Sequence, residues 1–116
     1  MIYEYNLLIP ANTLANAPVS MDLPVGHGII HKVEVEFPMG CNKAGLVTSR
    51  RALHQVWPTN AGGALSANGY TISGPEYQPV EDNPYQLEAY GWSPDTTYDH
   101  TVTIRLFQLP REVLEP

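Results

Sequence analysis

The stretch "IIHKVEVEF", residues 29–37, carries the clearest pattern in the chain. From Lys32 to Phe37, charged and apolar side chains alternate without a break. Because successive side chains of a strand point to opposite faces of a sheet, one face is expected to be buried and the other wet. The predicted buried face holds Ile29, His31, Val33, Val35 and Phe37, and the predicted wet face holds Ile30, Lys32, Glu34 and Glu36. This two-sided pattern is typical of an antiparallel sheet.

Similar runs occupy most of the remaining chain, separated by many of its eleven prolines and nine glycines. The runs cover residues 2–9, 19–23, 45–51, 54–57, 70–80, 85–92 and 100–109. A helical period is visible only over residues 109–115. We therefore predict an all-β fold: an antiparallel two-sheet β-sandwich of about eight short strands, jelly-roll-like or immunoglobulin-like. The prediction is one domain, residues 1–116, whose last residues, 110–116, form a short C-terminal tail.

Pro75 and Pro79 interrupt one of these runs. Proline has no N–H to donate to a neighbouring strand, so the run is predicted to lie at a sheet edge or to contain bulges.

Composition excludes several classes of function. The chain has 16% charged residues and a net charge of −6, and its six lysines and arginines form no dense patch. Nucleic-acid binding is therefore not expected, because phosphate backbones need clustered cations. No apolar run approaches the roughly 18 residues of a membrane span. The strand-like "IYEYNLLIP" follows Met1 directly, so no signal peptide is expected.

No residues form a convincing catalytic or metal-binding set. The stretch "GHGIIHKVEVE" resembles the metal-binding motif of cupins, but that motif has His-x-His, whereas His27 and His31 are separated by three residues. A cupin-like metalloprotein using these histidines and Glu36 is therefore the weakest alternative. A catalytic role for Cys41 would need a partner base, and the sequence does not show whether His54 or His100 approaches it in three dimensions. We predict a protein that is not an enzyme, with no catalytic residue, no cofactor and no metal.

Aromatic and apolar side chains at outward positions are the most informative feature. If Leu87 and Ala89 face the core, Tyr90 and Trp92 lie on the opposite face of their strand. Such side chains on a polar face suit a protein interface or a sugar platform. The predicted interface residues are Trp57, Pro58, Asn60, Tyr90, Trp92, Arg105, Phe107, Val113 and Leu114. The alternative for both tryptophans is that they pack beneath loops within the chain.

The stretch "PTNAGGALSANG", residues 58–69, is a long neutral loop. It has no Lys-Ser/Thr pair and no following helix, so it does not match a phosphate-binding loop. Its small residues allow close approach of a neighbouring protein. We expect residues 61–67 to contribute to assembly and to be dispensable for folding.

Four stretches, "LLIPANT", "VEVEFPMGC", "HQVWPTN" and "LEAYGWSPDTTYDHTVTIRLFQLP", resemble sequences in small β-sandwich proteins encoded among phage structural genes. The resemblance covers most of the chain and carries no catalytic residue. It implies a virion accessory protein, made in the host cytoplasm, such as a capsid decoration protein, a head-fibre base or a tail component. Such a protein would bind the major capsid protein or another virion protein as a homo-oligomer, with a trimer favoured.

A carbohydrate-binding β-sandwich is the main alternative. In that interpretation aromatic rings stack on sugar rings and polar side chains bind hydroxyl groups. The residues concerned would be Trp57, Tyr90, Trp92 and Tyr98 for stacking, and Asn60 and Asp99 for hydroxyl groups.

Overall fold

The computed structural model describes residues 1–40, 45–51, 54–60, 63–95 and 97–116. Cys41 and the loop residues 61–62 lie outside these ranges. The elements are β1 (Ile2–Ile9), β2 (Val19–Pro24), β3 (Gly28–Phe37), β4 (Leu46–Arg51), β5 (His54–Trp57), β6 (Tyr70–Val80), β7 (Gln86–Trp92), β8 (His100–Leu109) and α1 (Arg111–Leu114). The predicted all-β class is confirmed.

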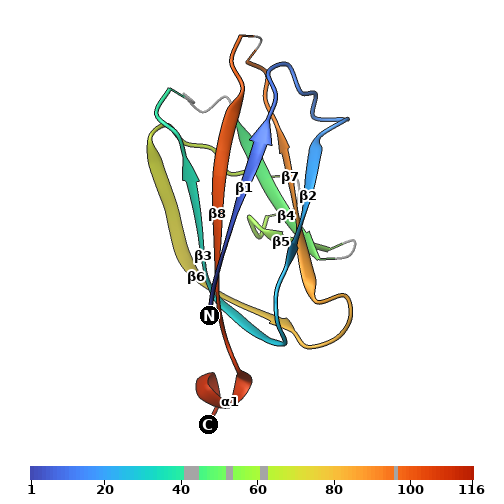
Figure 1. Ribbon diagram of the computed structural model, residues 1–116, viewed down its shortest axis with the longest axis vertical. Coiled ribbons are helices and arrows are strands. Elements are labelled where there is room, and N and C mark those ends of the chain that lie inside the picture. Colours follow the sequence, from blue (N-terminus) through green and yellow to red (C-terminus); the bar gives the residue numbers. More distant parts are fainter. Residues whose placement is uncertain (41–44, 52–53, 61–62, 96) are drawn as a thin grey trace.

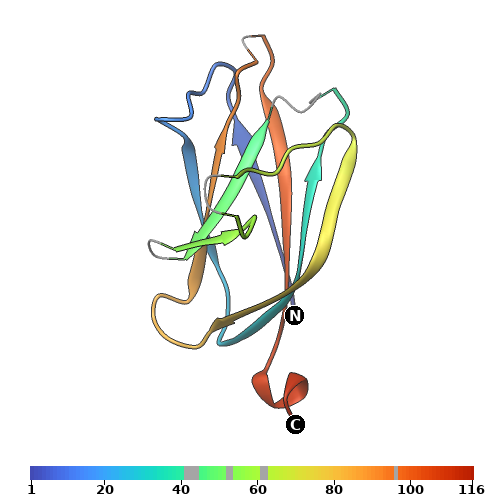
Figure 2. The same ribbon diagram turned by 180° about the vertical axis from the view of Figure 1, so that it is seen from behind.

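The strands form two four-stranded antiparallel sheets, with strand orders β1-β8-β3-β6 and β2-β7-β4-β5. The first sheet lies in front in Figure 1, and the second lies in front in Figure 2, which shows the molecule from behind. Strand β4 pairs with β5, β3 with β6, β2 with β7 and β1 with β8. This nested pairing, a long hairpin rolled up on itself, is the jelly-roll arrangement rather than the immunoglobulin-like one.

Strand β8 shows how the alternation builds the core. Val102, Ile104 and Leu106 are fully buried between the two sheets, whereas Thr101 is exposed and Phe107 is half-buried on the outer face. Complete burial of one such aliphatic side chain contributes about 1.5–3 kcal/mol to folding. The boundaries and the inward face predicted for residues 100–109 are both confirmed.

Strand β3 departs from the predicted alternation at one point. The register with both neighbouring strands shifts between Ile30 and Lys32, and relative to β8 His31 is the extra residue of a β-bulge. Ile30 consequently belongs to the core, and the His31 ring lies 6.4 Å from that of Phe107, a residue of the outer face. The predicted assignment of Ile30 to the wet face and of His31 to the buried face was therefore wrong. A bulge reverses the alternation on one side of itself.

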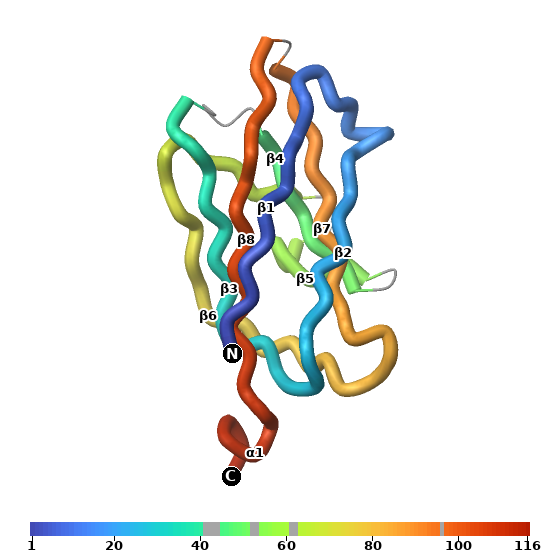
Figure 3. The backbone as a smooth tube through the Cα atoms, in the orientation of Figure 1, coloured from blue at the N-terminus to red at the C-terminus, as the bar shows by residue number. Residues whose placement is uncertain are grey.

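The two ends of the chain lie at the same end of the sandwich. The N-terminal ammonium group donates a hydrogen bond of 2.6 Å to the backbone oxygen of Gln108, and Figure 3 shows β1 running beside β8. The tail continues past β8 and places α1 beyond the body of the sandwich (Figure 1). Arg111 ties the tail to Glu81, the residue that follows β6, through hydrogen bonds of 3.1 and 3.2 Å from Nε to the carboxylate. These bonds lower the pKa of Glu81.

A candidate interaction surface around Trp92

Tyr90 and Trp92 lie on the outer face of the β2-β7-β4-β5 sheet. They alternate along β7 with the buried residues Ala89 and Gly91, and both are half-buried. The predicted orientation of the two aromatic residues is thus confirmed. In the register, Tyr90 is opposite Ser20 of β2 on one side and Thr48 of β4 on the other, so it lies in the middle of this face.

Two hollows meet at Trp92. The first, of about 260 Å³, is lined by polar and aromatic side chains that include Thr48, Arg50, Gln55 and Tyr90. The second, of about 270 Å³, is almost entirely apolar, and its walls include Leu14, Leu46 and Pro94. Leu14 is 61% exposed although it is a large apolar side chain. We call the set Leu14, Leu46, Arg50, Tyr90, Trp92 and Pro94 the Trp92 surface.

Arg50 and Glu88 fix the position of Tyr90 within this surface. The guanidinium carbon of Arg50 lies 4.9 Å from the centre of the Tyr90 ring, a cation–π contact. The Tyr90 hydroxyl donates a hydrogen bond of 3.0 Å to Oε2 of Glu88. Burial raises the pKa of Tyr90, the Glu88 hydrogen bond adds to this effect, and the charge of Arg50 opposes it. Tyr90 is therefore a neutral hydrogen-bond donor whose ring is covered on one side by a cation.

The start of the long loop forms one border of the polar hollow. Nε2 of Gln55 donates hydrogen bonds to the backbone oxygens of Pro58, at 2.8 Å, and Asn60, at 3.2 Å. These bonds hold Pro58 and Asn60 beside the hollow. Trp57 points the other way: it is only 5% exposed and belongs to the core between the sheets. It is therefore not part of an exposed interface or an exposed sugar platform in this fold, and the alternative, packing within the chain, is correct for Trp57.

The remaining predicted interface residues lie elsewhere. Arg105 is on the outer face of the β1-β8-β3-β6 sheet, where Nε bonds to Glu4 at 2.8 Å and Nη2 bonds to Glu36 at 3.1 Å. Phe107, on the same face, lies 5.0 Å below the ammonium group of Lys32. Val113 and Leu114 are in the tail. The nine predicted residues therefore do not form one surface, because the sandwich separates its two outer faces.

Sequence reasoning missed Leu14, Leu46, Arg50 and Pro94. Leu46 and Arg50 share the outer face with Trp92 and Glu88, which they pair with in the β4–β7 register. Val47, Thr48 and Ser49 between them are all buried, so β4 does not show the alternation seen in β7. Leu14 and Pro94 lie in loops, where alternation gives no information about the direction of a side chain.

The alternative ligand sets do not converge on one point. The ring of His27 packs 6.0 Å from that of Tyr85, whereas Glu36 binds Arg105. In the described part of the chain no group of three His, Cys, Asp or Glu side chains is placed to hold a metal ion. The Asp99 carboxylate, predicted to bind a sugar, accepts a hydrogen bond of 2.8 Å from the backbone N–H of Ala11.

None of the described helices has the length and apolar character needed to cross a membrane.

No protein-family model and no curated protein matches the chain. Among solved structures, it is similar to a chain of the cyanophage Pam1 capsid asymmetric unit, with a TM-score of 0.54 and 15% identity over 95% of this chain and 84% of that one. A carbohydrate-binding structure, CBM4, aligns with a TM-score of 0.44 and 12% identity over 89% of both chains. At these identities the first similarity establishes a shared β-sandwich fold.

Proposed function

We propose that the chain is a non-enzymatic structural protein of a phage particle, most simply a capsid decoration or accessory protein. It binds the major capsid protein or another virion protein through the Trp92 surface, and it acts in the virion as a homo-oligomer, with a trimer favoured. The observation that carries the proposal is the apolar hollow between Leu14, Leu46 and Trp92, with Arg50 at its side. Tryptophan, tyrosine and arginine are the residues most enriched at interface hot spots.

The two outer faces differ in how easily they lose water. On the β1-β8-β3-β6 face, Arg105 is bound to carboxylates of Glu4 and Glu36, and Lys32 lies 3.5 Å from Glu34. Covering such a network would remove several charges from water, which costs several kcal/mol per ion. The Trp92 surface presents mainly uncharged groups. We therefore assign the contact with the particle to the Trp92 surface and the charged face to solvent.

The fold similarity to a phage capsid chain supports this proposal, because it shows that a sandwich of this kind occurs in a phage particle. An interface of standard size buries about 800 Å² on each partner. Several copies on one lattice would add avidity to a modest individual affinity.

The test is binding to empty capsids of the phage that encodes the chain, measured by co-sedimentation. Leu14→Asp should weaken binding at least about tenfold, because it places a charge in the apolar hollow. Leu8→Asp is the matched control: Leu8 is 54% exposed, close to the 61% of Leu14, but it lies on the other sheet. Equal binding by wild type and Leu14→Asp would contradict the assignment. The homo-oligomer would be contradicted if the free protein sedimented as a monomer and if its copies bound to the capsid singly.

Carbohydrate binding is the second candidate. The polar hollow of about 260 Å³ beside Trp92, with Thr48 and Gln55 in its wall, is the observation in its favour. Against it, Arg50 covers one face of the Tyr90 ring. Glycan-array binding by a monomeric protein, abolished by Trp92→Ala, would favour this candidate over a virion role.

A further inference from the structure

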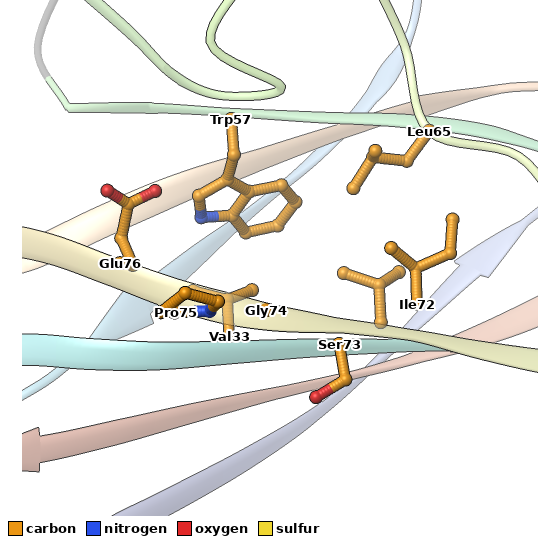
Figure 4. A pocket seen from close by; sticks show the side chains of 9 residues that line it. Val33, Trp57, Leu65, Ile72, Ser73, Gly74, Pro75 and Glu76 are labelled. Carbon is orange, nitrogen blue, oxygen red and sulfur yellow. The ribbon is translucent and has the colours of Figure 1, made fainter.

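A further pocket lies between the two sheets, on the side of the sandwich where β5 and β6 form the edges. Its volume is about 150 Å³. Figure 4 shows that Trp57 forms one wall, with Leu65 and Ile72 opposite its benzene ring. Val33 and Val35 of β3 also line it. This intersheet pocket faces the core and is separate from the Trp92 surface.

The pocket exists because the two edge strands differ in length. Strand β5 has four residues and β6 has eleven, so β5 covers only part of the core that β6 spans. Leu65, from the long loop, covers another part, since its backbone N–H and C=O both bond to Val47, at 2.8 and 3.0 Å. The space left between them is lined mainly by apolar side chains, together with Ser73 and Glu76.

One polar group in this wall lacks a partner. Within the described residues, the buried Nε1 of Trp57 has no hydrogen-bond acceptor, although the residue is only 5% exposed. Figure 4 shows the nitrogen edge of the indole turned toward the side of the pocket formed by Pro75 and Glu76. A buried N–H without an acceptor is costly, and a native structure contains few of them. An acceptor supplied from outside the chain would remove this cost.

The neighbouring groups do not supply that acceptor. Oε1 of Glu76 already accepts a hydrogen bond of 2.9 Å from the backbone N–H of Tyr77. The Ser49 hydroxyl, which lies opposite Trp57 in the β4–β5 register, is itself buried without a partner in the described structure. Glu76 is the charged residue that lines the pocket, and its carboxylate disfavours an anionic ligand.

We propose that the intersheet pocket binds one small uncharged molecule that consists of an aromatic ring or branched aliphatic group with a single carbonyl or hydroxyl oxygen. The apolar part fills the space between Trp57, Leu65 and Ile72, and the oxygen accepts the hydrogen bond from Nε1 of Trp57. The volume fits this class of ligand, since an apolar cavity of about 150 Å³ holds one benzene molecule.

Acetophenone and ethylbenzene test the proposal, because they differ mainly in the acceptor oxygen. The chain has two tryptophans, so a ¹H–¹⁵N spectrum contains two indole signals, which Trp57→Phe and Trp92→Phe assign. Acetophenone should shift the Trp57 signal and leave the Trp92 signal in place. Ethylbenzene should bind about three- to tenfold more weakly, the net effect of one neutral hydrogen bond. Trp57→Phe should bind both compounds equally.

Leu65→Phe, which fills the pocket, should abolish binding of both compounds; if this variant does not fold, the comparison of the two compounds on wild type still decides. The proposal is overturned if neither compound shifts the Trp57 signal at millimolar concentration, or if wild type binds both equally. It is also overturned if the Trp57 signal of the free protein follows the titration of a carboxyl group and Glu76→Ala abolishes that response. Glu76 would then be the acceptor. None of these outcomes bears on capsid binding, which uses a different surface.

Discussion

Gly91 shows how one residue without a side chain lets the two sheets pack closely. It lies on the inner face of β7, and a Cβ atom added there would be 2.8 Å from Cδ1 of Ile9 and 3.0 Å from Cδ2 of Leu7. Both neighbours are buried residues of β1, in the opposite sheet. Space for them therefore depends on the absence of a Cβ atom at position 91.

Gly91→Ala should lower the free energy of unfolding by about 1–3 kcal/mol, the usual cost of overpacking a core. Urea unfolding measures the loss. Gly74→Ala is the matched control, since Gly74 is also a strand residue and a Cβ atom there would meet no atom within 4 Å. Equal stability of the two variants would contradict this account of the packing.

The two tryptophans had the same predicted role and have different ones in the structure. Trp92 continues the regular alternation of β7 and faces outward. Trp57 follows a register shift between β4 and β5, after which Val56 and Trp57 are both buried. A bulge of this kind cannot be recognised in the sequence pattern of a four-residue strand. The sequence therefore could not distinguish the buried environment of Trp57 from the outward-facing one of Trp92.

Leu65 and Ala67, in the long loop between β5 and β6, contribute to the core. Leu65 pairs with Val47 through backbone hydrogen bonds and packs against the core cluster, and Ala67 is 7% exposed. This packing of Leu65 and Ala67 argues against the expectation that residues 61–67 are dispensable for folding, which stays a prediction until the deletion is made. The apolar side chains of Leu65 and Ala67 anchor the described part of this loop to the core.

Leu65→Ala should destabilise the protein by about 1–2 kcal/mol, less than the 2–5 kcal/mol typical of a fully buried leucine, because Leu65 is only partly buried. Leu14→Ala makes the same change at an exposed loop residue and should alter stability by less than about 0.5 kcal/mol. Thermal unfolding of the two variants gives the comparison. If Leu65→Ala were as stable as Leu14→Ala, the loop would not contribute to the core.

The molecule as a whole has open sheet edges, because a jelly roll does not close its sheets. Strand β6 is the last strand of its sheet and contains both Pro75 and Pro79, as predicted from the sequence. Between them, the N–H of Tyr77 is bound by the Glu76 carboxylate. Prolines and satisfied N–H groups reduce the ability of an edge to pair with a strand of another molecule.

The double variant Pro75→Thr/Pro79→Thr should keep the fold and associate through this edge, because threonine restores two N–H donors and favours strands. Light scattering at increasing protein concentration measures the association. Pro10→Thr, outside the strands, is the control and should behave as wild type. A double variant no more associated than Pro10→Thr would show that these prolines do not protect the edge.

The strands, their boundaries and most inward faces were predictable, because burial of alternate side chains leaves a local pattern with a period of two residues. Residues 100–109 are an example: the strand and its buried face agree with the structure throughout. The placement of Pro75 and Pro79 followed from proline chemistry in the same local way.

The features that the local sequence pattern could not predict depend on contacts between residues that are distant in the sequence. Arg105 was predicted to be available to a partner, but Glu4, 101 positions away, binds it across β1 and β8. The bulge at His31 and the inward direction of the Trp57 side chain depend on the registers of paired strands. The apolar hollow depends on two loops that meet at Trp92. Each of these features is determined when the sheets form and pack together, so it cannot be predicted from the local alternation of side chains.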